Sequence, residues 1–342
     1  MIELKIVNEK DAEEWDRLVE SSPHGTIFHT WKWLKIMEKY STRMIFSKRC
    51  KSKLYPVIIL DGNTPIALFP LFYYKNILKI VSSPPFAVED YYLGPLLIFD
   101  HNLKQSKKEH RLITAIKEID KYIDSELHSN FTLFHSAPGL VDSRPFKWVG
   151  YEVEPRHTYV LRLNSIENIW NNFSQSLRRE IKKTKEENIV VSEGSKKELI
   201  HIYNLLKERN RIHAPKEFIL DIFNHFYSDN LRIFIAEKND EPLSGIVTTC
   251  FNKKVSFWIG APKFSISGIN PNGMIFYENM KWALENGYKY YEIIGADDPP
   301  LYPFKSKFNG ELVNYLTARK YHPSAIKVIE AIYRSFKTRY KI

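Results

Sequence analysis

Apolar and polar residues in the first half of the chain follow both helical and strand periods. Two mainly apolar runs between Leu54 and Tyr73 flank Asp61-Gly62-Asn63, a turn signal that predicts an antiparallel hairpin. Helical spacing predicts a helix over Trp31–Tyr40 with Thr30 as its N-cap, and a long amphipathic helix over Leu103–Leu127. The other elements predicted there are a helix at Asp11–Glu20, strands at Lys79–Ser83, Tyr91–Ile98 and Phe131–His135, and a loop-rich segment at Ala137–His157.

A similar order of elements recurs in the second half. A hairpin is predicted from Leu231–Glu237 and Leu243–Phe251, and the strand Val255–Gly260, the helix Asn272–Asn286 and the strand Tyr288–Ile294 follow it. Helices are predicted before it at Ser165–Asn188, Lys196–His213 and Phe218–Tyr227. Because helices, hairpin, strand, helix and strand thus occur twice in one order, we expect two α/β units of similar design.

Composition limits the class of protein and the kinds of site. A length of 342 residues predicts two domains, and 44% hydrophobic with 26% charged residues excludes disordered and collagen-like chains. Only 13 glycines argue against several Gly-rich phosphate loops. Cys50 and Cys250 match no ligand spacing and are expected to be unrelated buried thiols. The histidines form no HxxxH or HExxH motif, so no metal site is predicted.

Targeting signals point to the cytoplasm. The stretch Met1–Trp15 carries five acidic residues and lacks an apolar core, so it does not resemble a signal peptide. The longest apolar stretch contains the Asp-Gly-Asn turn and therefore predicts a hairpin, not a membrane span. A last helix is predicted at Ser324–Tyr340, docked onto one of the domains; its basic residues also suit a peripheral contact with the inner face of a membrane.

A formal net charge of +10 is partly concentrated in one predicted helix. Arg178, Lys182 and Lys185 recur at helical spacing and form one basic stripe. Such a stripe suits an anionic partner, whether pyrophosphate, nucleic acid or a lipid headgroup, and a solvated charged face is the alternative.

Two loops in the second half are candidates for chemistry. Gly268, Asn272 and Gly273 precede or begin a helix whose backbone N–H groups can hold a pyrophosphate; an ordinary loop with an N-cap is the alternative. The segment Gly295–Gly310 follows a strand and combines two carboxylates, three prolines and two lysines. Loops at strand ends commonly carry sites, and a lysine there can stabilise charge on a carbonyl or phosphate oxygen. A tethered surface loop fits this composition equally well.

Several segments resemble FemAB-type peptidoglycan-bridge aminoacyl transferases, which belong to the wider superfamily of GNAT-like N-acyltransferases. The matching segments run in the same order over nearly the whole chain: Phe28–Trp33, Tyr92–Pro95, Tyr159–Leu163 followed by FSQSLRREIKKTKEENIVV, Gly287–Gly295 and Tyr302–Tyr315. The resemblance implies an α/β fold of two tandem GNAT-like domains side by side, with mixed, partly antiparallel sheets flanked by helices. The first would comprise residues 1–156, with 322–342 packing back on it, and the second, residues 157–321, would carry the site.

The resemblance also implies roles for individual residues. The lysine of a Phe-Lys pair, here Phe304 and Lys305, lies in the substrate channel of the family and stabilises charge during transfer. An arginine after the middle helix binds the anionic acceptor, and Arg209 is the better match, with Arg211 close behind. Arg178, Lys182 and Tyr302 complete the predicted substrate-binding group. The fuller family pattern around the arginine is absent, which leaves the acceptor open.

These residues predict an N-acyl or aminoacyl transfer. A neutral amine would attack an activated ester or thioester, Lys305 and backbone N–H groups would stabilise the oxyanion, and Asp297 or Asp298 would accept the proton. A simple turn role is the alternative for these two carboxylates. The donor, aminoacyl-tRNA or acyl-CoA, stays open, because no coiled-coil insertion for transfer RNA contact interrupts the second unit. No tightly bound cofactor is expected.

The acceptor class and two further functions complete the expectations. The acceptor would be an anionic small molecule or a lipid-linked one, such as a sugar nucleotide or a peptide of the cell envelope. One alternative is a CoA-dependent N-acetyl or acyltransferase acting on an amino sugar or small amine. Another is a non-catalytic protein that binds RNA or anionic lipid, although no RNP-like, KH or zinc-finger signature supports it. We expect no contact with DNA.

Overall fold

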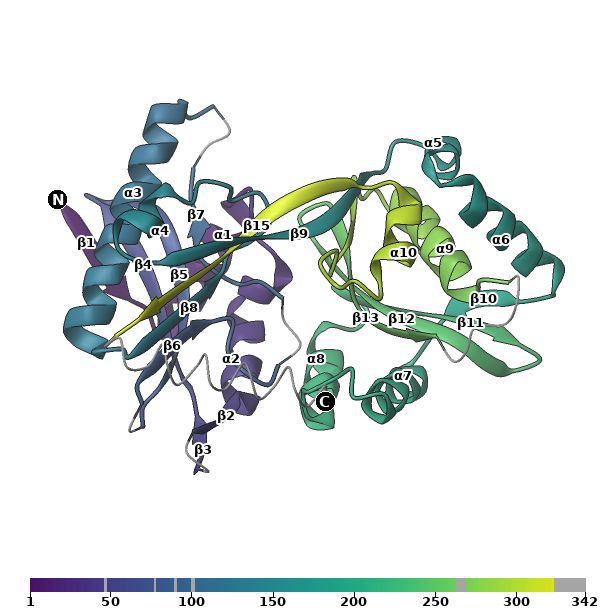
Figure 1. Cartoon of the computed structure of the whole chain (residues 1–342), viewed down its shortest axis with the longest axis horizontal. Helices are drawn as coiled ribbons and strands as arrows, with labels where there is room; N and C mark the ends of the chain where they lie inside the picture. Colours follow the sequence, from purple (N-terminus) through teal and green to yellow (C-terminus); the bar gives the residue numbers. More distant parts are fainter. Residues whose placement is uncertain (46–47, 77, 89–90, 100–101, 263–268, 323–342) are drawn as a thin grey trace. The chain divides into compact units, whose positions relative to one another are not determined.

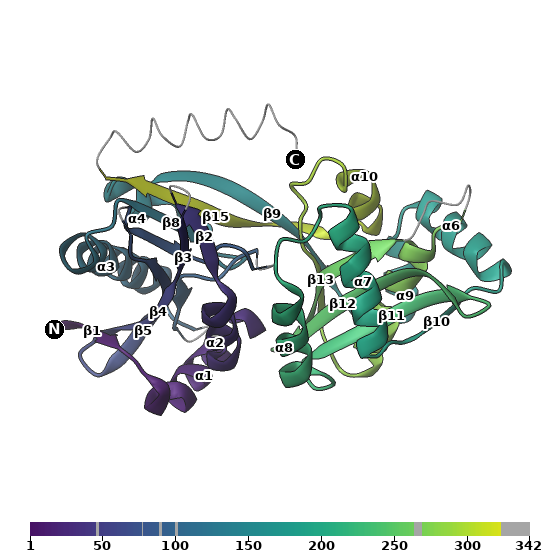
Figure 2. The same cartoon turned by 90° about the horizontal axis from the view of Figure 1, so that it is seen from below.

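The computed structural model describes residues 1–45, 48–76, 78–88, 91–99, 102–262 and 269–322 (Figures 1 and 2). The chain forms two compact units, one of Met1–Arg156 and Asn314–Ile342, the other of His157–Val313. It leaves the first unit within β9 (Glu152–Arg162) and returns within β15 (Glu311–Tyr321). The predicted helix Ser324–Tyr340, and with it the packing of residues 323–342, lies outside the described residues.

The first unit is a mixed sheet with the strand order β1-β4-β5-β6-β8-β15. Its strands are β1 (Ile2–Ile6), β4 (Lys53–Asp61), β5 (Thr64–Tyr74), β6 (Ile80–Ser83), β8 (Phe131–His135) and the short β7 (Leu96–Leu97) on β5, beside a separate pair, β2 (Thr42–Ile45) and β3 (Lys48–Lys51). Its helices are α1 (Ala12–Ser21), α2 (Trp31–Tyr40), α3 (Gln105–Tyr122), which runs on into a π-helical turn at Ile123–Leu127, and α4 (Arg144–Trp148). Among the described pairs of this sheet, β6 with β8 is parallel, because α3 forms the crossover between them.

The apolar side of α3 forms the core of this unit with the sheet. Leu112, Ile116 and Ile119 recur at helical spacing and are buried against Phe69 on β5 and Phe134 on β8. This spacing is the one that predicts an amphipathic helix from the sequence, and the helix begins and ends within the predicted range.

The second unit has the strand order β9-β14-β13-β12-β11-β10. Its further strands are β10 (Val190–Glu193), β11 (Leu231–Lys238), β12 (Glu241–Phe251), β13 (Lys254–Pro262) and β14 (Tyr290–Ile293). Its helices are α5 (Ile166–Asn172), α6 (Gln175–Glu186), α7 (Lys196–Glu208), α8 (Lys216–Phe226), α9 (Pro271–Glu285) and the one-turn α10 (Tyr302–Lys305). Figure 2 shows α7 and α8 on one face of the sheet and α9 on the other. The predicted α/β class, with mixed sheets flanked by helices, is confirmed.

The predicted repeat appears in the topology of both units. In the first, β4, β5 and β6 are antiparallel neighbours, and α3 leads to β8, which is parallel to β6. In the second, β11, β12 and β13 are antiparallel neighbours, and α9 leads to β14, which is parallel to β13. Among the described strands, each unit therefore has a parallel pair next to an antiparallel meander. In the second unit, the candidate site lies at the carboxyl end of this parallel pair.

Four predicted elements differ from the structure. The strand Tyr91–Ile98 shrinks to Leu96–Leu97, because the N–H groups of Leu93 and Gly94 donate to the carbonyl of His135 instead. The segment Ala137–His157, predicted to be loop-rich, contains α4 and the start of β9. A capping serine, Ser174, starts α6 and so divides the predicted helix Ser165–Asn188 in two. The helix predicted to end at His213 ends at Glu208, since Asn210 adopts a φ of 51°.

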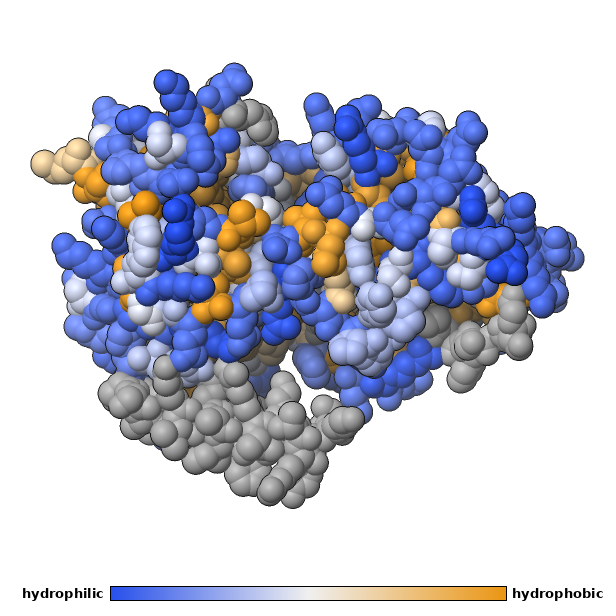
Figure 3. Space-filling view, turned by 45° about the horizontal axis from the view of Figure 1, so that its top comes forward, coloured by the Kyte–Doolittle hydropathy of each residue, from blue (hydrophilic) through white to orange (hydrophobic). Residues whose placement is uncertain are grey.

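Polar side chains cover most of the surface drawn in Figure 3, and apolar atoms emerge there in small separate groups. The exposed apolar residues include Met44, Val141 and Trp148, at 62%, 64% and 59% exposure. Scattered apolar atoms of this kind are ordinary on globular surfaces. Among the helices of the described ranges, none combines the length and the apolar composition that crossing a bilayer requires.

Candidate functional site

The parallel strands of the second unit diverge at their carboxyl ends. β13 and β14 are paired from Lys254 and Tyr290 as far as Phe257 and Ile293, where β14 ends. β13 continues to Pro262 along β12 and contains a bulge, with Trp258 as the extra residue between two positions paired with β12. A bulge bends its strand, and the chain after β14 turns away, so the carbonyls of Ile294 and Gly295 bond to a side chain instead of to the ladder.

That side chain is Lys305, the last residue of α10. Its Nζ donates to the carbonyl oxygen of Ile294 and, at 3.1 Å, to that of Gly295. It also lies 5.7 Å from the centre of the Phe257 ring, a cation–π distance. Lys305 is 4% exposed, whereas most lysines lie at the surface.

Burial changes the charge equilibrium of this lysine. Removal from water lowers the pKa of Lys305 to about 8, and the negative charge of Asp298 opposes this effect in part. Near neutral pH the side chain therefore holds a proton that it releases more easily than an ordinary lysine does. A cation in a site that excludes water stabilises a developing oxyanion more strongly than one in solvent.

Gly295 makes room for the ammonium group. A Cβ atom on Gly295 would lie 2.8 Å from the Nζ atom of Lys305. Its φ of +85° also falls in the region that favours glycine. Phe304, beside Lys305, packs edge-on against Phe276 of α9 and against Phe308, with ring centres 5.7 and 5.2 Å away. The backbone and these rings together fix the lysine at the end of β14.

The two carboxylates of the loop after β14 each have a partner. Asp297 binds His157: its Oδ2 accepts the backbone N–H at 2.8 Å, and its Oδ1 lies 2.7 Å from the ring Nδ1. Asp298 pairs with Arg211, whose Nη1 lies 3.4 Å from Oδ2. The carbonyl of Asp298 also accepts the N–H groups of Leu301 and Tyr302 and so starts α10. The backbone contacts of Asp298 fit a turn role, whereas Asp297 bonds to a distant strand, and the proton-accepting role of the two carboxylates stays a prediction.

The loop after α7 brings positive charge to this place. Arg209 is exposed at the carboxyl end of α7, and Arg211 follows it, half exposed and paired with Asp298. Asp298 acts in turn on the charge of Lys305. The structure thus brings Arg211 to Asp298, 87 residues further along the chain and in the same loop as Lys305. Tyr302 lies 55% exposed on the same short helix as Lys305.

A family model described as an acetyltransferase (GNAT) domain matches residues 171–306, which include α6, α9 and Lys305. The structure of FemX has a TM-score of 0.65 and 13% identity, covering 96% of this chain and 99% of that one. The chain has a FemAB-like tandem GNAT fold. The predicted resemblance is therefore confirmed for the fold, and the match to the acetyltransferase (GNAT) domain model lies within the second unit.

Two other solved structures have the same fold. The C-terminal domain of a putative lysylphosphatidylglycerol synthetase from Agrobacterium fabrum gives a TM-score of 0.56 at 10% identity, covering 95% of this chain and 97% of that one. A tandem GNAT protein from the clavulanic acid biosynthesis pathway gives 0.51 at 9%, covering 94% and 98%. No curated protein sequence matches the chain. GNAT proteins use acyl-CoA as a substrate, and at these identities the solved structures show the fold alone.

In the second unit a network of polar side chains joins the segment Gly295–Gly310, here called the lysine loop, to two helices. Glu180 of α6 accepts from the Nζ of Lys307 and from the side-chain amide of Asn270, each at 2.7 Å. Asn270 caps α9, and its own N–H donates to Thr184 of α6 at 2.7 Å. The carbonyl of Lys307 accepts from Ser174 at 2.8 Å. Lys307 thus connects its loop to α6, and its charge is paired with Glu180.

The other predicted site residues lie on α6 and at the start of α9. Arg178 is half-buried and Lys182 exposed on α6, and Lys185 of the same stripe pairs with Glu278 at 3.1 Å. At the start of α9, Asn272 accepts from Ser244 at 3.1 Å, and the N–H of Gly273 donates to Asn270 at 2.8 Å. These bonds fit an ordinary N-cap, and the pyrophosphate role stays a prediction. Gly268 lies outside the described residues.

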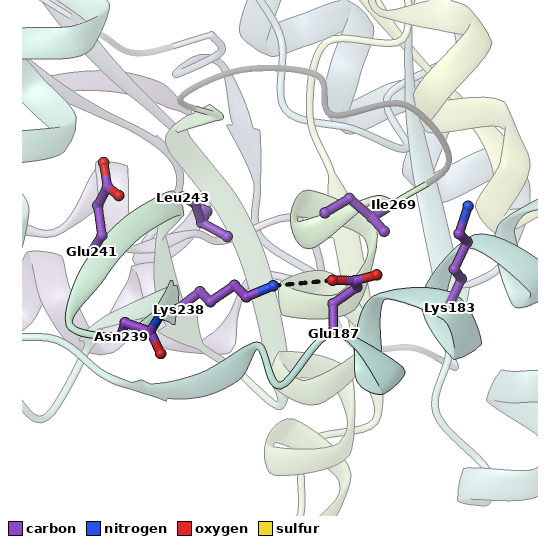
Figure 4. A pocket seen from close by; sticks show the side chains of 7 residues that line it. All are labelled: Lys183, Glu187, Lys238, Asn239, Glu241, Leu243 and Ile269. Atoms are coloured by element: carbon purple, nitrogen blue, oxygen red, sulfur yellow. Dashed lines mark hydrogen bonds and ion pairs between the residues drawn. The ribbon is translucent and has the colours of Figure 1, made fainter.

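A cavity of about 350 Å³ lies between α6 and the β11–β12 turn (Figure 4). Two lysines and two glutamates are among its lining residues, which are Lys183, Glu187, Lys238, Asn239, Glu241, Leu243 and Ile269. Lys238 and Glu187 form an ion pair at 3.0 Å, as Figure 4 shows. The charges balance, so this cavity offers no net attraction to an anion, and none of the predicted site residues lines it.

In the described part of the chain, no group of three or more histidine, cysteine or acidic side chains is arranged to hold a metal ion. Cys50 and Cys250 are both free and buried, as predicted, and burial raises the pKa of Cys250 to about 11. A thiol of that kind is a poor nucleophile at neutral pH.

Sequence reasoning missed His157, Gly295 and Glu180. His157 falls at the end of a segment read as loop, although it shares the strand alternation of Tyr159 and Leu161, which was the available signal. Its partner Asp297 lies 140 residues further on, and Glu180 lies 127 residues before Lys307. Contacts over such separations leave no local pattern in the sequence.

Proposed function

We propose that this protein is an N-acyl or aminoacyl transferase that attaches an acyl or aminoacyl group to an amine of an anionic acceptor. The observation that carries the proposal is the buried Lys305 ammonium at the diverging end of β14, within the matched GNAT region. In the reaction the acceptor nitrogen attacks the carbonyl carbon of the donor, and Lys305 stabilises the oxyanion that forms. The carbonyl then re-forms, and the thiol or alcohol of the donor leaves.

The charges around Lys305 support an anionic acceptor. Arg211 is half exposed and its carboxylate partner, Asp298, is 33% exposed, so their 3.4 Å ion pair is solvent-screened and exchangeable. A phosphate or carboxylate on the acceptor can compete with Asp298 for this guanidinium, because arginine binds both groups in a planar, bidentate way. Arg209 begins the same loop and adds to the positive charge.

The names of two similar structures favour an aminoacyl group. FemX and a lysylphosphatidylglycerol synthetase domain share the fold of this chain over nearly its whole length. Aminoacyl transfer to a cell-envelope acceptor, such as a peptidoglycan precursor or an anionic lipid, is the corresponding proposal for this protein. The donor would be aminoacyl-tRNA, and the reaction would take place in the cytoplasm, including at the inner face of the membrane.

A second candidate is CoA-dependent acylation of an amino sugar or small amine. The matching family model is described as an acetyltransferase domain, and the clavulanic acid pathway protein is a tandem GNAT protein whose structure was solved without acetyl-CoA. The same lysine serves this reaction, because a thioester and an ester develop the same oxyanion. The two candidates therefore differ in donor and acceptor and share the site.

One experiment separates these candidates. The protein is melted with acetyl-CoA or with aminoacyl-tRNA, and transfer to amine acceptors is followed by mass spectrometry. A true donor at 100 times its Kd stabilises the fold by about 2.7 kcal/mol. We expect one donor to stabilise the protein and to give an amide product that Lys305→Met forms far more slowly. Binding only to RNA or anionic vesicles, with strong salt dependence and no product, would overturn the proposal in favour of a non-catalytic protein.

A further inference from the structure

His157 and Asp297 form a side-chain pair at the edge of the lysine loop. The carboxylate of Asp297 takes both the backbone N–H and the ring Nδ1 of His157, at 2.8 and 2.7 Å. The backbone contact holds the carboxylate in place, and the carboxylate in turn orients the ring through Nδ1 and leaves Nε2 as the nitrogen for a further partner. Both side chains keep access to solvent, at 31% and 27% exposure. The pair is thus oriented yet reachable by a substrate.

The strand register places His157 beside the lysine. Tyr159 of β9 pairs with Ile293, the last residue of β14. Because the two strands are antiparallel, His157, two residues before Tyr159, lies at the same end of the pair as Gly295, two residues after Ile293. The carbonyl of Gly295 is one of the two that hold Lys305. Thr158 shows that β9 and the end of β14 stay in contact here, because its Oγ1 donates to the carbonyl of Ile293 at 3.3 Å.

Alternation along β9 places the ring on the correct face. Tyr159 and Leu161 belong to the hydrophobic core on the α9 side of the sheet, which also contains Phe308 and contacts Phe304. Side chains two apart on a strand share a face, so His157 projects to the same side as α10. Tyr159 supports this placement, since burial raises its pKa and the neighbouring Tyr302 and Asp297 act in the same direction.

We propose that His157, oriented by Asp297, is the base that takes the proton from the acceptor amine in the transfer reaction. This inference rests on the proposed function and adds a catalytic residue to it. Asp297 is then a positioning residue and not itself the proton acceptor. A carboxylate that orients an imidazole through Nδ1 and leaves Nε2 to the substrate is a recurrent arrangement for proton transfer.

The step balances in atoms and charge. The amine nitrogen forms the C–N bond with the donor carbonyl carbon, and its proton moves to Nε2 of His157. The tetrahedral intermediate, with its oxyanion beside Lys305, re-forms the carbonyl and expels the thiolate or alkoxide. The proton on His157 then passes to that leaving group, directly or through water, which restores the neutral imidazole. No oxidant, reductant or metal is required.

Several charged and titratable groups surround the pair and contribute to the pH dependence. They are Arg156 and Tyr159 on β9, Asp298 in the loop, Tyr302 and Lys305 on α10, and Arg211 after α7. Imidazole acts as a base only when it is neutral, so wild-type activity should fall toward acid pH. Lys305 acts as a cation, so it limits the alkaline side.

The test compares His157→Ala, His157→Gln and Asp297→Asn, with His225→Gln, an exposed histidine on α8, as the matched control. The donor that supports wild-type transfer is used, and kcat and KM are followed from pH 5 to 9. We expect kcat to fall about 100-fold or more for both His157 variants, with the loss of the fall toward acid pH. Added imidazole should restore part of the activity of His157→Ala, because it fits the space that the ring leaves.

Asp297→Asn should lower kcat about tenfold or more and leave KM nearly unchanged, because the carboxylate orients the ring without touching the substrate. Thermal melts show that each variant is folded, and donor-induced stabilisation shows that it binds. An unchanged pH profile in His157→Gln, or a rate that imidazole does not restore in His157→Ala, would overturn the inference while wild-type transfer persists. Absence of wild-type transfer with either donor would instead refute the proposed function.

Discussion

The two units of this protein end their parallel strand pairs in different ways. In the first unit the carbonyl of His135, at the end of β8, accepts the backbone N–H groups of Leu93 and Gly94 at 2.9 and 3.1 Å. In the second unit the corresponding carbonyl, that of Ile294, accepts the ammonium group of Lys305. One strand end is therefore closed by neutral backbone groups, and the other by a cation.

The side chains at these two strand ends differ in charge as well. Burial, with the positive charges of Arg156 and Arg319, lowers the pKa of His135 to about 4, so this imidazole stays neutral at physiological pH. Tyr92, fully buried, packs against Tyr315 over this region of the first unit. Lys305, with a pKa of about 8, is mostly charged near neutrality. The same topology thus ends on buried neutral groups in one unit and on a buried cation in the other.

Replacing the cation should have the largest effect. Lys305→Met keeps the length of the side chain and removes its charge, and we expect transfer to slow by about 10²–10³, the usual loss of one oxyanion donor. Lys289→Met, an exposed lysine just before β14, is the matched control and should keep wild-type activity. Steady-state transfer rates of the folded variants measure the difference, and equal rates would remove the distinction between the two units.

The buried, neutral His135 at the end of β8 should lower the stability of the fold at acid pH. The folded pKa of His135 is lowered from 6.5 to about 4, so the unfolded chain binds the proton more strongly between these values. Stability is therefore unaffected above pH 6.5 and falls as the pH drops toward 4, by on the order of 3 kcal/mol. His135→Gln should lack this contribution. Denaturant unfolding of both proteins from pH 7 to 4 tests the assignment, and parallel curves would contradict it.

Alanine substitutions at two glycines separate the effect of backbone strain on stability from the effect of crowding Lys305 on activity. Gly295 and Gly287 have φ values of +85° and +81°, and a Cβ on Gly287 meets nothing within 4 Å, whereas one on Gly295 meets Lys305. Both alanine variants should lose about 1–2 kcal/mol of stability from the left-handed backbone. Only Gly295→Ala should also lose transfer activity, about tenfold or more, through displacement of the ammonium group. Similar activity in the two variants would argue against the close fit.

Glu180 should give the smallest change. Glu180→Gln weakens the contacts with Lys307 and Asn270 that hold the lysine loop on α6 and at the start of α9. Because these contacts are partly exposed, we expect a loss of about 1 kcal/mol and a several-fold lower rate. Glu186→Gln, an exposed position on the same helix, is the control. Melting curves and transfer rates measured together show whether the network positions the loop.

Local patterns in the sequence were enough for much of the fold. The range Trp31–Tyr40 matches α2, and Phe131–His135 matches β8, because apolar spacing and flanking turns mark both. The strand Tyr91–Ile98 was wrong, since its N–H groups bond to the distant His135. Whether an apolar run joins a ladder depends on which backbone groups reach it from elsewhere, and a single sequence does not contain that information.

The candidate site, too, was predictable only in part from the sequence. Lys305, Phe304 and Arg211 were named because they fall in motifs, and the structure joins Lys305 and Arg211 through Asp298. The partner of Asp297 was not foreseen, because His157 lies at the opposite end of the second unit in sequence. The basic stripe on α6 was a correct helical pattern, yet Lys185 within it bonds to Glu278 instead of facing Lys305.

The most direct measurement is the pH dependence of transfer by wild type and Lys305→Met on the alkaline side. If Lys305 acts as a buried cation, the wild-type rate relative to that of the variant falls with a midpoint near pH 8, as the ammonium loses its proton. Over the same range the stability of wild type relative to the variant should rise, because the folded chain holds the proton less tightly than the unfolded one. A rate ratio that stays constant from pH 7 to 10 would contradict the assignment of Lys305 as the group that stabilises the oxyanion.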